Sequence, residues 1–295
     1  MHTRWEHRAV SVGDKVWRLC VQGSQTSVLG VTSRGLFLLA LPQHIVFVSF
    51  ERYRSPLTIN LDQAFERLGI VEVGATAQFS DSRLIFPSIE DAISLSAVAV
   101  WHCPPPSLPA QPRAEQTQLL QMIAKDVLAQ AGSNGLVALL PRLMDWPDAS
   151  SLTTEHFALL DQLLAVRRAV QVGDHPAMIA GLTSLLGQGR GLTPSGDDVV
   201  IGLLLLLNRW PADRDWMAVN RAVIEAAYQV TTTLSANLIE CAAAGQGDER
   251  LITVADGIAA GSTSIEECVD CVLKWGSSSG SDALIGMALA VQAAR

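Results

Sequence analysis

Two segments of this chain place the same polar residues in the same order. Residues 195–202 read Ser-Gly-Asp-Asp-Val-Val-Ile-Gly, and residues 279–286 read Ser-Gly-Ser-Asp-Ala-Leu-Ile-Gly. A serine followed three residues later by an aspartate has the spacing of a capping box, in which a hydroxyl and a carboxylate satisfy amides at a helix start. The sequence therefore predicts two equivalent helix N-termini, with Asp198 and Asp282 as structural caps.

Such a helix start can bind an anion, because its unpaired amides and the positive end of the helix dipole point at the ligand. Gly196 and Gly280 leave both starts without a side chain, so a ligand can approach the main chain. Two such helix N-termini in one domain predict a binding site for a ligand with an anionic group at each end. The alternative is that the repeat records only the duplication of a helical hairpin, since capping boxes are common.

The segment before the first repeat adds conformational freedom and a cation. Residues 186–194 read Leu-Gly-Gln-Gly-Arg-Gly-Leu-Thr-Pro, with three alternate glycines around Arg190. No Gly-Lys-Ser/Thr ending of a P-loop follows, and the glycines come after a helical pattern, where a dinucleotide-binding fingerprint would follow a strand. Common nucleotide-binding motifs are therefore disfavoured.

A polar cluster, Thr-Thr-Thr-Leu-Ser-Ala-Asn-Leu over residues 231–238, lies inside a long apolar helical pattern. Residues four apart share a helix face, so Thr231 pairs with Ser235 and Thr233 with Asn237. Two interpretations stay open: hydroxyls that bond back to helix carbonyls, or a polar stripe that faces a pocket.

Composition excludes several classes of protein. The formal net charge of −8 disfavours nucleic acid or an anionic membrane as a partner over a broad surface. No apolar run reaches the length of a membrane span, and no secretory signal is visible, so a cytoplasmic location is expected. The five cysteines do not fit a disulfide scaffold; Cys268 and Cys271 are expected to be core residues on one helix face.

Five prolines between residues 104 and 112 divide the chain. They exclude helix and central strand and predict a linker over 104–114, between a β-rich domain at 1–103 and an α-helical domain at 115–295. Short β-branched segments between turn residues predict an antiparallel β sandwich or barrel in the first domain, so the fold class is α+β. The predicted strands are 27–31, 36–39, 45–48, 57–61 and 94–100, with one helix near 61–68.

Helical periodicity, with a glycine after most of the helix ends, indicates that the second domain is α-helical. The predicted helices are 115–131, 154–171, 175–186, 195–208, 216–244, 249–260, 264–275 and 279–294. Gly202 and Gly286 lie two turns inside the repeated helices, where a glycine lowers helix propensity but allows close packing. They predict that these helices approach another backbone.

The segment from Gly187 to Gly202, centred on Gly-Leu-Thr-Pro-Ser-Gly-Asp-Asp, resembles the signature of the family that includes AllH, a subunit of bacterial oxamate carbamoyltransferase. Residues 276–282 resemble that family's Gly-His-Thr-Ser-Gly-x-Asp pattern, with Ser277 in place of the histidine. Arg190 stands where the family loop often has proline.

The resemblance implies carbamoyl transfer between carbamoyl phosphate and oxamate, which gives oxalurate and phosphate in purine (allantoin) degradation. It also implies AllF-like and AllG-like companion subunits, and a homo-oligomer is a further expectation. No cofactor is expected, although Mg²⁺ could bridge a carboxylate and a phosphate.

The implied site divides the residues by role. Catalytic roles are expected for Asp197, Ser195 and Thr193. Substrate contacts are expected from Gly191, Arg190, Gly196, Ser278, Ser279, Gly280, Thr232, Ser235 and Asn237, where Thr232 and Ser235 match a Thr/Ser pair of the family. Amides of residues 195–197 and 279–281 would hold a phosphate or carboxylate. Because three carboxylates would repel that anion, Asp198 and Asp282 are expected to turn inward and leave Asp197 nearest the ligand.

Two other functions remain open. One is a non-catalytic binding or assembly subunit of a multi-subunit enzyme. The other is a metal-dependent hydrolase with Asp197, Asp198 and Asp282 as ligands.

Overall fold

The computed structural model describes residues 5–62, 70–107, 111–131, 135–146, 153–210 and 215–293. The chain forms two compact units, Met1–Pro104 and Pro105–Arg295. Strands and one α-helix make up the described part of the first unit, and helices make up that of the second. The α+β class predicted from the sequence is confirmed.

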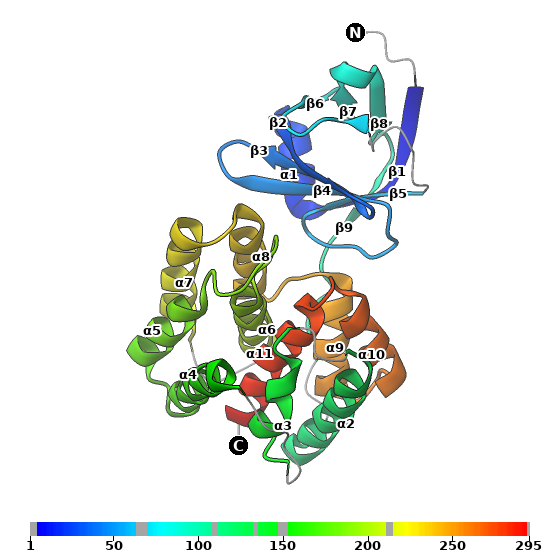
Figure 1. The fold of residues 1–295 in the computed structure, drawn as a ribbon. Coiled ribbons are helices and arrows are strands. Elements are labelled where there is room, and N and C mark those ends of the chain that lie inside the picture. The colour runs from blue at the N-terminus through cyan, green and yellow to red at the C-terminus, as the bar shows by residue number, and fades with distance from the viewer. Residues whose placement is uncertain are drawn as a thin grey trace. The chain divides into compact units, whose positions relative to one another are not determined.

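The first unit is a β-barrel (Figure 1). Its strands are β1 (Trp5–Gly13), β2 (Gln25–Thr32), β3 (Gly35–Ala40), β4 (His44–Ser49), β5 (Thr58–Leu61), β6 (Thr76–Ser80), β7 (Arg83–Phe86), β8 (Asp91–Ser94) and β9 (Ala99–Trp101). They follow the order β5-β4-β3-β2-β6-β7-β8-β1-β9, and pairing of β5 with β1 closes the barrel. Helix α1 (Asp14–Gln22) packs against β6 and β1.

The pairing of the strands differs from the prediction in one respect. Most neighbours are antiparallel, but β1 runs parallel to β8 and β9, and β4 runs parallel to β5. Parallel neighbours need crossover connections, which the alternation within a single strand cannot reveal. The purely antiparallel arrangement is therefore wrong.

The predicted strands at 27–31, 36–39, 45–48 and 57–61 are confirmed as β2 to β5. The strand predicted at 94–100 is wrong, because the chain turns between β8 and β9. Ala97 has a φ of 56°, and the Val98 amide donates to the Leu95 carbonyl at 3.3 Å. Most of the helix predicted near 61–68 lies outside the described residues, and Leu61 ends β5.

The second unit is helical. Its α-helices are α2 (Arg113–Ala131), α3 (Leu140–Leu143), α4 (Thr154–Val172), α5 (His175–Leu185), α6 (Ser195–Arg209), α7 (Met217–Val230), α8 (Thr233–Ala243), α9 (Glu249–Ala260), α10 (Ile265–Lys274) and α11 (Ser279–Ala293). All but one of the predicted helices are confirmed within two residues at each end. None of the described helices has the length and apolar character needed to cross a membrane.

The helix predicted over 216–244 is wrong, because it is two helices. Thr231 leaves the helical conformation with φ −125° and ψ −172°. Thr232 then caps α8, since its hydroxyl oxygen accepts a hydrogen bond from the Ser235 amide at 3.1 Å. The polar cluster is therefore the junction between α7 and α8, and the threonine-rich sequence creates a helix start instead of a stripe on one helix.

Helices α6 and α11 form the centre of this unit, with the other helices around them (Figure 1). They cross so closely that a Cβ on Gly202 would lie 1.9 Å from the Ala283 carbonyl oxygen. A Cβ on Gly286 would lie 2.0 Å from the Val199 carbonyl oxygen. The predicted close approach of the two repeated helices to a backbone is confirmed, and the backbone is that of the other repeat.

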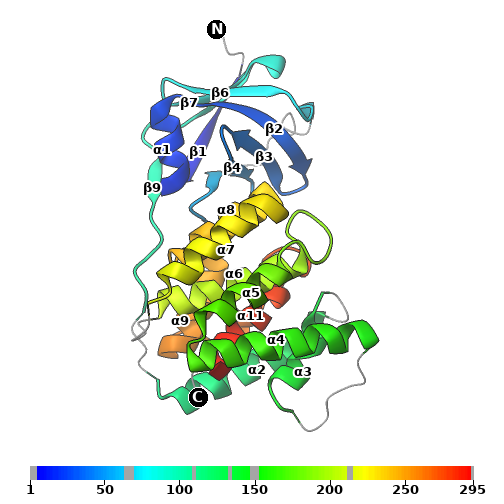
Figure 2. The ribbon, with the colours of Figure 1, turned by 90° about the vertical axis from the view of Figure 1, so that its left-hand side faces the viewer.

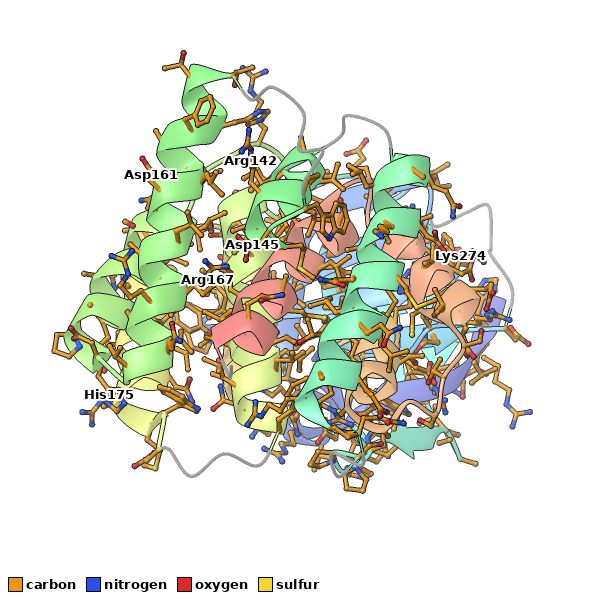
Figure 3. The ribbon with its side chains drawn as sticks, turned by 90° about the horizontal axis from the view of Figure 1, so that it is seen from below. Arg142, Asp145, Asp161, Arg167, His175 and Lys274 are labelled. Atoms are coloured by element: carbon orange, nitrogen blue, oxygen red, sulfur yellow. The ribbon has the colours of Figure 1, made fainter. Side chains whose placement is uncertain are left out.

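The helices outside this pair hold it from several sides. Figure 3 shows Arg167 of α4 beside Asp145, in the turn after α3. The Arg167 guanidinium donates to the Leu143 carbonyl at 3.1 Å, so α4 and α3 are tied together next to α11.

On α10, Cys268 and Cys271 are buried free thiols, as predicted, and burial raises their pKa values to about 12 and about 11.

Candidate functional site

The two repeated serine segments meet in space. The Thr193 hydroxyl, just before α6, lies 3.0 Å from the hydroxyl of Ser279, the first residue of α11. Thr193, Ser195, Ser278 and Ser279 are each partly exposed. The structure therefore brings together, at one accessible place, four hydroxyls that the sequence assigned to catalysis or substrate binding.

The serine of each repeat lies near the aspartate of the other repeat and lowers its pKa. The Ser195 hydroxyl faces Asp282, and the Ser279 hydroxyl faces Asp198. This exchange follows from the crossing of α6 and α11 near their first turns, which brings each aspartate close to the serine of the other helix.

The predicted capping role of Asp198 and Asp282 is wrong. Pro194 is the N-cap residue of α6, and no side chain caps that helix. Asp282 instead accepts, through Oδ1, the Leu136 amide at 2.6 Å. Leu136 and its neighbour Gly135 were not identified from the sequence; a Cβ on Gly135 would lie 2.5 Å from the same oxygen, so the glycine is the only local signal of this contact.

The amides at the helix starts are less available to a ligand than the sequence suggested. Gly196 donates to the Gln188 carbonyl at 2.9 Å, Asp197 to the Pro194 carbonyl at 2.9 Å, and Gly280 to the Trp275 carbonyl at 2.8 Å. These three amides donate to carbonyls of the chain itself, and the anion-binding role of the helix starts stays a prediction.

The two Ser-Gly glycines serve packing of the main chain. A Cβ on Gly196 would lie 2.1 Å from the Leu185 carbonyl oxygen, and one on Gly280 would lie 1.9 Å from that of Val272. Each repeated helix therefore begins directly against the end of the preceding helix. No side chain fits between them.

Both carboxylate oxygens of Asp197 accept hydrogen bonds from the protein itself. It is fully buried, and its Oδ1 accepts the Gly187 amide at 2.8 Å. Its Oδ2 accepts the Thr231 hydroxyl. One carboxylate thus fixes both the start of the glycine-rich loop and the junction between α7 and α8, so the expectation that Asp197 lies nearest the ligand is not supported by its surroundings.

The glycine-rich loop follows a path that only glycine adopts easily. Gly187, Gly189 and Gly191 have φ values of 73°, 119° and 98°. Arg190 and Gly191 are exposed at its tip. The Thr232 hydroxyl donates to the Leu192 carbonyl at 2.7 Å, which holds the loop against the start of α8 (Figure 2).

The remaining two expected contacts lie on α8 and are buried. Ser235 is fully buried, and its hydroxyl has no hydrogen-bond partner among the residues that the structure describes. Asn237 donates to the Tyr228 hydroxyl at 3.2 Å, and Tyr228 donates to Glu240 at 2.7 Å. Asn237 therefore belongs to a network between α7 and α8.

Burial and mutual repulsion shift the protonation of the crossed aspartates. Burial, helped by the nearby charges of Asp282 and Asp197, raises the pKa of Asp198 to about 8, although the Ser279 and Thr193 hydroxyls act in the opposite direction. Burial also raises the pKa of Asp282, but only to about 6, because the Leu136 amide and the Ser195 and Ser278 hydroxyls favour its charged form. Of the two carboxyls, Asp198 therefore has the stronger tendency to hold a proton.

A metal centre is not formed by these aspartates. Within the described ranges, no group of three or more His, Cys, Asp or Glu side chains could hold a metal ion. The donors that surround Asp197 and Asp282 are amides and hydroxyls of the protein itself. The residues described thus offer no ligand set for the metal-dependent hydrolase.

Comparison with known proteins bears on residues 185–291. These residues match a family model described as oxamate carbamoyltransferase subunit AllH. The match begins at the end of α5 and includes the glycine-rich loop, α6 and most of α11. Comparisons with curated proteins and with solved structures gave no match. Over residues 185–291, this chain is therefore similar to the AllH family.

Proposed function

We propose that this chain is a subunit of an oxamate carbamoyltransferase and that its ligand site lies where α6 and α11 begin. The observation that carries the proposal is the contact between Thr193 and Ser279, which joins the two repeated segments at 3.0 Å. Both segments lie inside the part of the chain that matches AllH. The reaction would belong to purine degradation in the cytoplasm.

The proposed reaction joins the oxamate nitrogen to the carbonyl carbon of carbamoyl phosphate. A carbon–nitrogen bond forms, the carbon–oxygen bond to phosphate breaks, and the nitrogen loses a proton. Such a transfer needs orientation of two small anions and stabilisation of charge on the carbonyl oxygen more than a nucleophile from the protein.

The hydroxyls of Thr193, Ser195, Ser278 and Ser279 supply hydrogen-bond donors, and Arg190 at the exposed loop tip supplies a positive charge for a phosphate or carboxylate. Asp197 acts indirectly in this proposal. Its carboxylate accepts a hydrogen bond from the Gly187 amide and so holds the loop that carries Arg190.

The experiment is a turnover assay of this chain reconstituted with AllF-like and AllG-like subunits, with phosphate release as the readout. Ser195→Ala is expected to lower kcat/KM about 10-fold or more, as expected for loss of one donor to a developing charge. Ser264→Ala, which removes the N-cap hydroxyl of α10, is the matched control and should retain activity. Full activity of both Ser195→Ala and Asp197→Ala would contradict the proposal.

A second candidate function is a non-catalytic assembly subunit, and one observation favours it. Leu192 and Val230 are 52% and 58% exposed. Both belong to the loop and helix end that meet at Gly187, whose Cβ position lies 3.0 Å from the Val230 carbonyl oxygen. Co-purification that Leu192→Ser and Val230→Ser abolish, without any binding of carbamoyl phosphate to the pure chain, would favour this function over the first.

A further inference from the structure

Two carboxyl groups behind the convergent serines are fully buried and only partly hydrogen-bonded. Asp282 accepts the Leu136 amide through Oδ1 at 2.6 Å. Its Oδ2 and both oxygens of Asp198 have no hydrogen-bond partner in the described part of the chain, and both residues are 0% exposed. Because buried carboxylates are normally paired or bound to an ion, these three oxygens call for a partner.

The crossing of α6 and α11 places the three oxygens in one region. A Cβ on Gly286 would lie 2.0 Å from the carbonyl oxygen of the residue after Asp198. A Cβ on Gly202 would lie 1.9 Å from the carbonyl oxygen of the residue after Asp282. The two carboxyls therefore belong to helix turns that pack directly against each other, and the charge of Asp282 raises the pKa of Asp198.

Among the described residues, no basic side chain balances this charge. The groups that shift the pKa of Asp198 are two hydroxyls and two further carboxylates. Those that shift the pKa of Asp282 are the Leu136 amide and two serine hydroxyls. Two buried carboxyls without a counter-charge from the protein are costly to ionise, and a bound cation removes that cost.

Uncharged oxygens surround the same region. The Thr193 and Ser279 hydroxyls lie 3.0 Å apart where α6 and α11 begin. Ser278 lies beside Asp282, because a Cβ on Gly135 would meet the Ser278 Cβ at 2.8 Å and Asp282 Oδ2 at 2.9 Å. Hydroxyl oxygens have lone pairs that can bind a cation, and uncharged protein oxygens such as backbone carbonyls replace the hydration shell of K⁺.

This set of oxygens suits a monovalent ion better than a divalent one. Within the ranges described, no group of three or more His, Cys, Asp or Glu side chains could hold a metal ion, which argues against a divalent centre. Mg²⁺ also keeps several of its waters, to which fully buried carboxyls give little access.

We propose that Asp198 and Asp282 hold a monovalent cation such as K⁺ between the starts of α6 and α11, with the hydroxyls of Thr193, Ser278 and Ser279 as further ligands. Without the cation, a proton on Asp198 relieves the repulsion between the carboxyls. With the cation, both carboxyls are ionised and neutralised together. The inference does not depend on the proposed function, because it concerns a cation and not the anionic ligand.

The test measures the thermal stability of the full chain in different chlorides at equal ionic strength, so that general screening is the same. A pH of about 8.5 keeps protons from competing with the cation, because burial raises the pKa of Asp198 to about 8. At about 100 mM, the best-fitting of K⁺, Na⁺ and ammonium should raise the Tm by about 3 °C or more above its value in tetramethylammonium chloride, whose ion is too large for the site. That shift corresponds to a cation at about ten times its Kd.

Two variants and a second measurement separate ion binding from folding. Asp198→Asn keeps the shape of the side chain but removes its charge, so the shift should fall below about 1 °C. Asp174→Asn changes an exposed helix-capping aspartate of α5 and should keep the full shift. If Asp198→Asn does not fold, native crystals soaked in thallium(I), an anomalously scattering substitute for K⁺, should show an anomalous peak between Asp198 and Asp282.

Three results would overturn the inference. One is a Tm that agrees within about 1 °C in all four chlorides. Another is a shift that Asp198→Asn retains in full, and the third is a thallium(I) soak without a peak between the two carboxyls. Each of them leaves the proposed function standing, because that function is tested by turnover and by anion binding.

Discussion

Gly202 of α6 lies against the main chain of α11 at Ala283, with space for a hydrogen atom but not for a methyl group. Because the neighbour is a carbonyl oxygen and not the end of a flexible side chain, Gly202→Ala forces the two helices apart. We predict a loss of about 3 kcal/mol in the free energy of unfolding, measured by urea denaturation.

Gly247 offers the control for this substitution. A Cβ there would meet side-chain atoms of Leu205 and Ile252 at 3.6 Å or more, and its φ is not in the left-handed region. Gly247→Ala should therefore change stability by no more than about 1 kcal/mol. Similar losses for both variants would contradict the close contact of α6 with α11.

The buried acid at Asp198 predicts a pH dependence of stability. The pKa of this carboxyl is 3.8 in the unfolded chain, and burial raises it to about 8 in the folded chain. The folded state therefore binds more protons between these values, and the free energy of unfolding falls as the pH rises from about 4 to about 8.

Asp198→Asn removes that titration. Relative to the native chain, the variant should gain stability with rising pH, on the order of a few kcal/mol by about pH 8. Urea denaturation at about pH 5 and about pH 8.5 measures the difference, with Asp174→Asn as the reference. An equal offset at both pH values would mean that Asp198 is ionised in the folded chain.

The ion pair between Arg209 of α6 and Asp256 of α9 predicts that removal of the Asp256 carboxylate lowers the stability of the folded chain. Their shortest distance is 2.6 Å, and the guanidinium also donates to the carbonyls of Gly245 and Pro105. The Arg209 side chain is 1% exposed, so Asp256→Asn removes the negative charge that faces a buried guanidinium. We expect a loss of about 3 kcal/mol in thermal or urea denaturation.

A surface pair gives the comparison for that loss. Lys274 and Asp270 lie 2.7 Å apart, with side chains about half exposed. Asp270→Asn should cost less than about 0.5 kcal/mol, because solvent screens an exposed pair. If the two substitutions cost the same, burial does not determine the strength of the Arg209 pair.

The contacts of Asp197 predict that this residue controls the order of the glycine-rich loop. Asp197→Ala removes the acceptor of the Gly187 amide and of the Thr231 hydroxyl. Hydrogen exchange at Gly187 should accelerate at least about tenfold, because that amide loses a charge-assisted hydrogen bond. Thr153→Ala, at the exposed cap of α4, should leave exchange at Gly187 unchanged; acceleration in both variants would point to general loosening.

The sequence was most informative where a local pattern has a local cause. The ends of α9 follow from a capping aspartate, Asp248, and a glycine, Gly261, which act within one turn of helix. Thr231 and Thr232 show the limit of periodicity, because an apolar repeat continued across a point where the backbone leaves the helix. The parallel pairing of β4 with β5 likewise depends on a crossover, not on alternation along either strand.

The candidate site was predicted in its residue types but not in its pairing. The repeated Ser-Gly-x-Asp pattern identified Ser195, Ser279, Asp198 and Asp282, yet the spacing suggested partners within each helix. The crossing of α6 over α11 exchanges those partners, and the Leu136 amide that distinguishes Asp282 from Asp198 comes from a segment distant in sequence. Contacts between distant segments are set by tertiary packing, which one sequence does not reveal.

Calorimetric titration of the pure chain with carbamoyl phosphate, oxamate and inorganic phosphate shows whether a small anion binds where α6 and α11 begin. The proposed site predicts binding of at least one of these anions, a loss of about tenfold or more in Ser195→Ala, and no loss in Ser264→Ala. Binding that both variants retain in full would contradict a ligand site at the meeting point of α6 and α11.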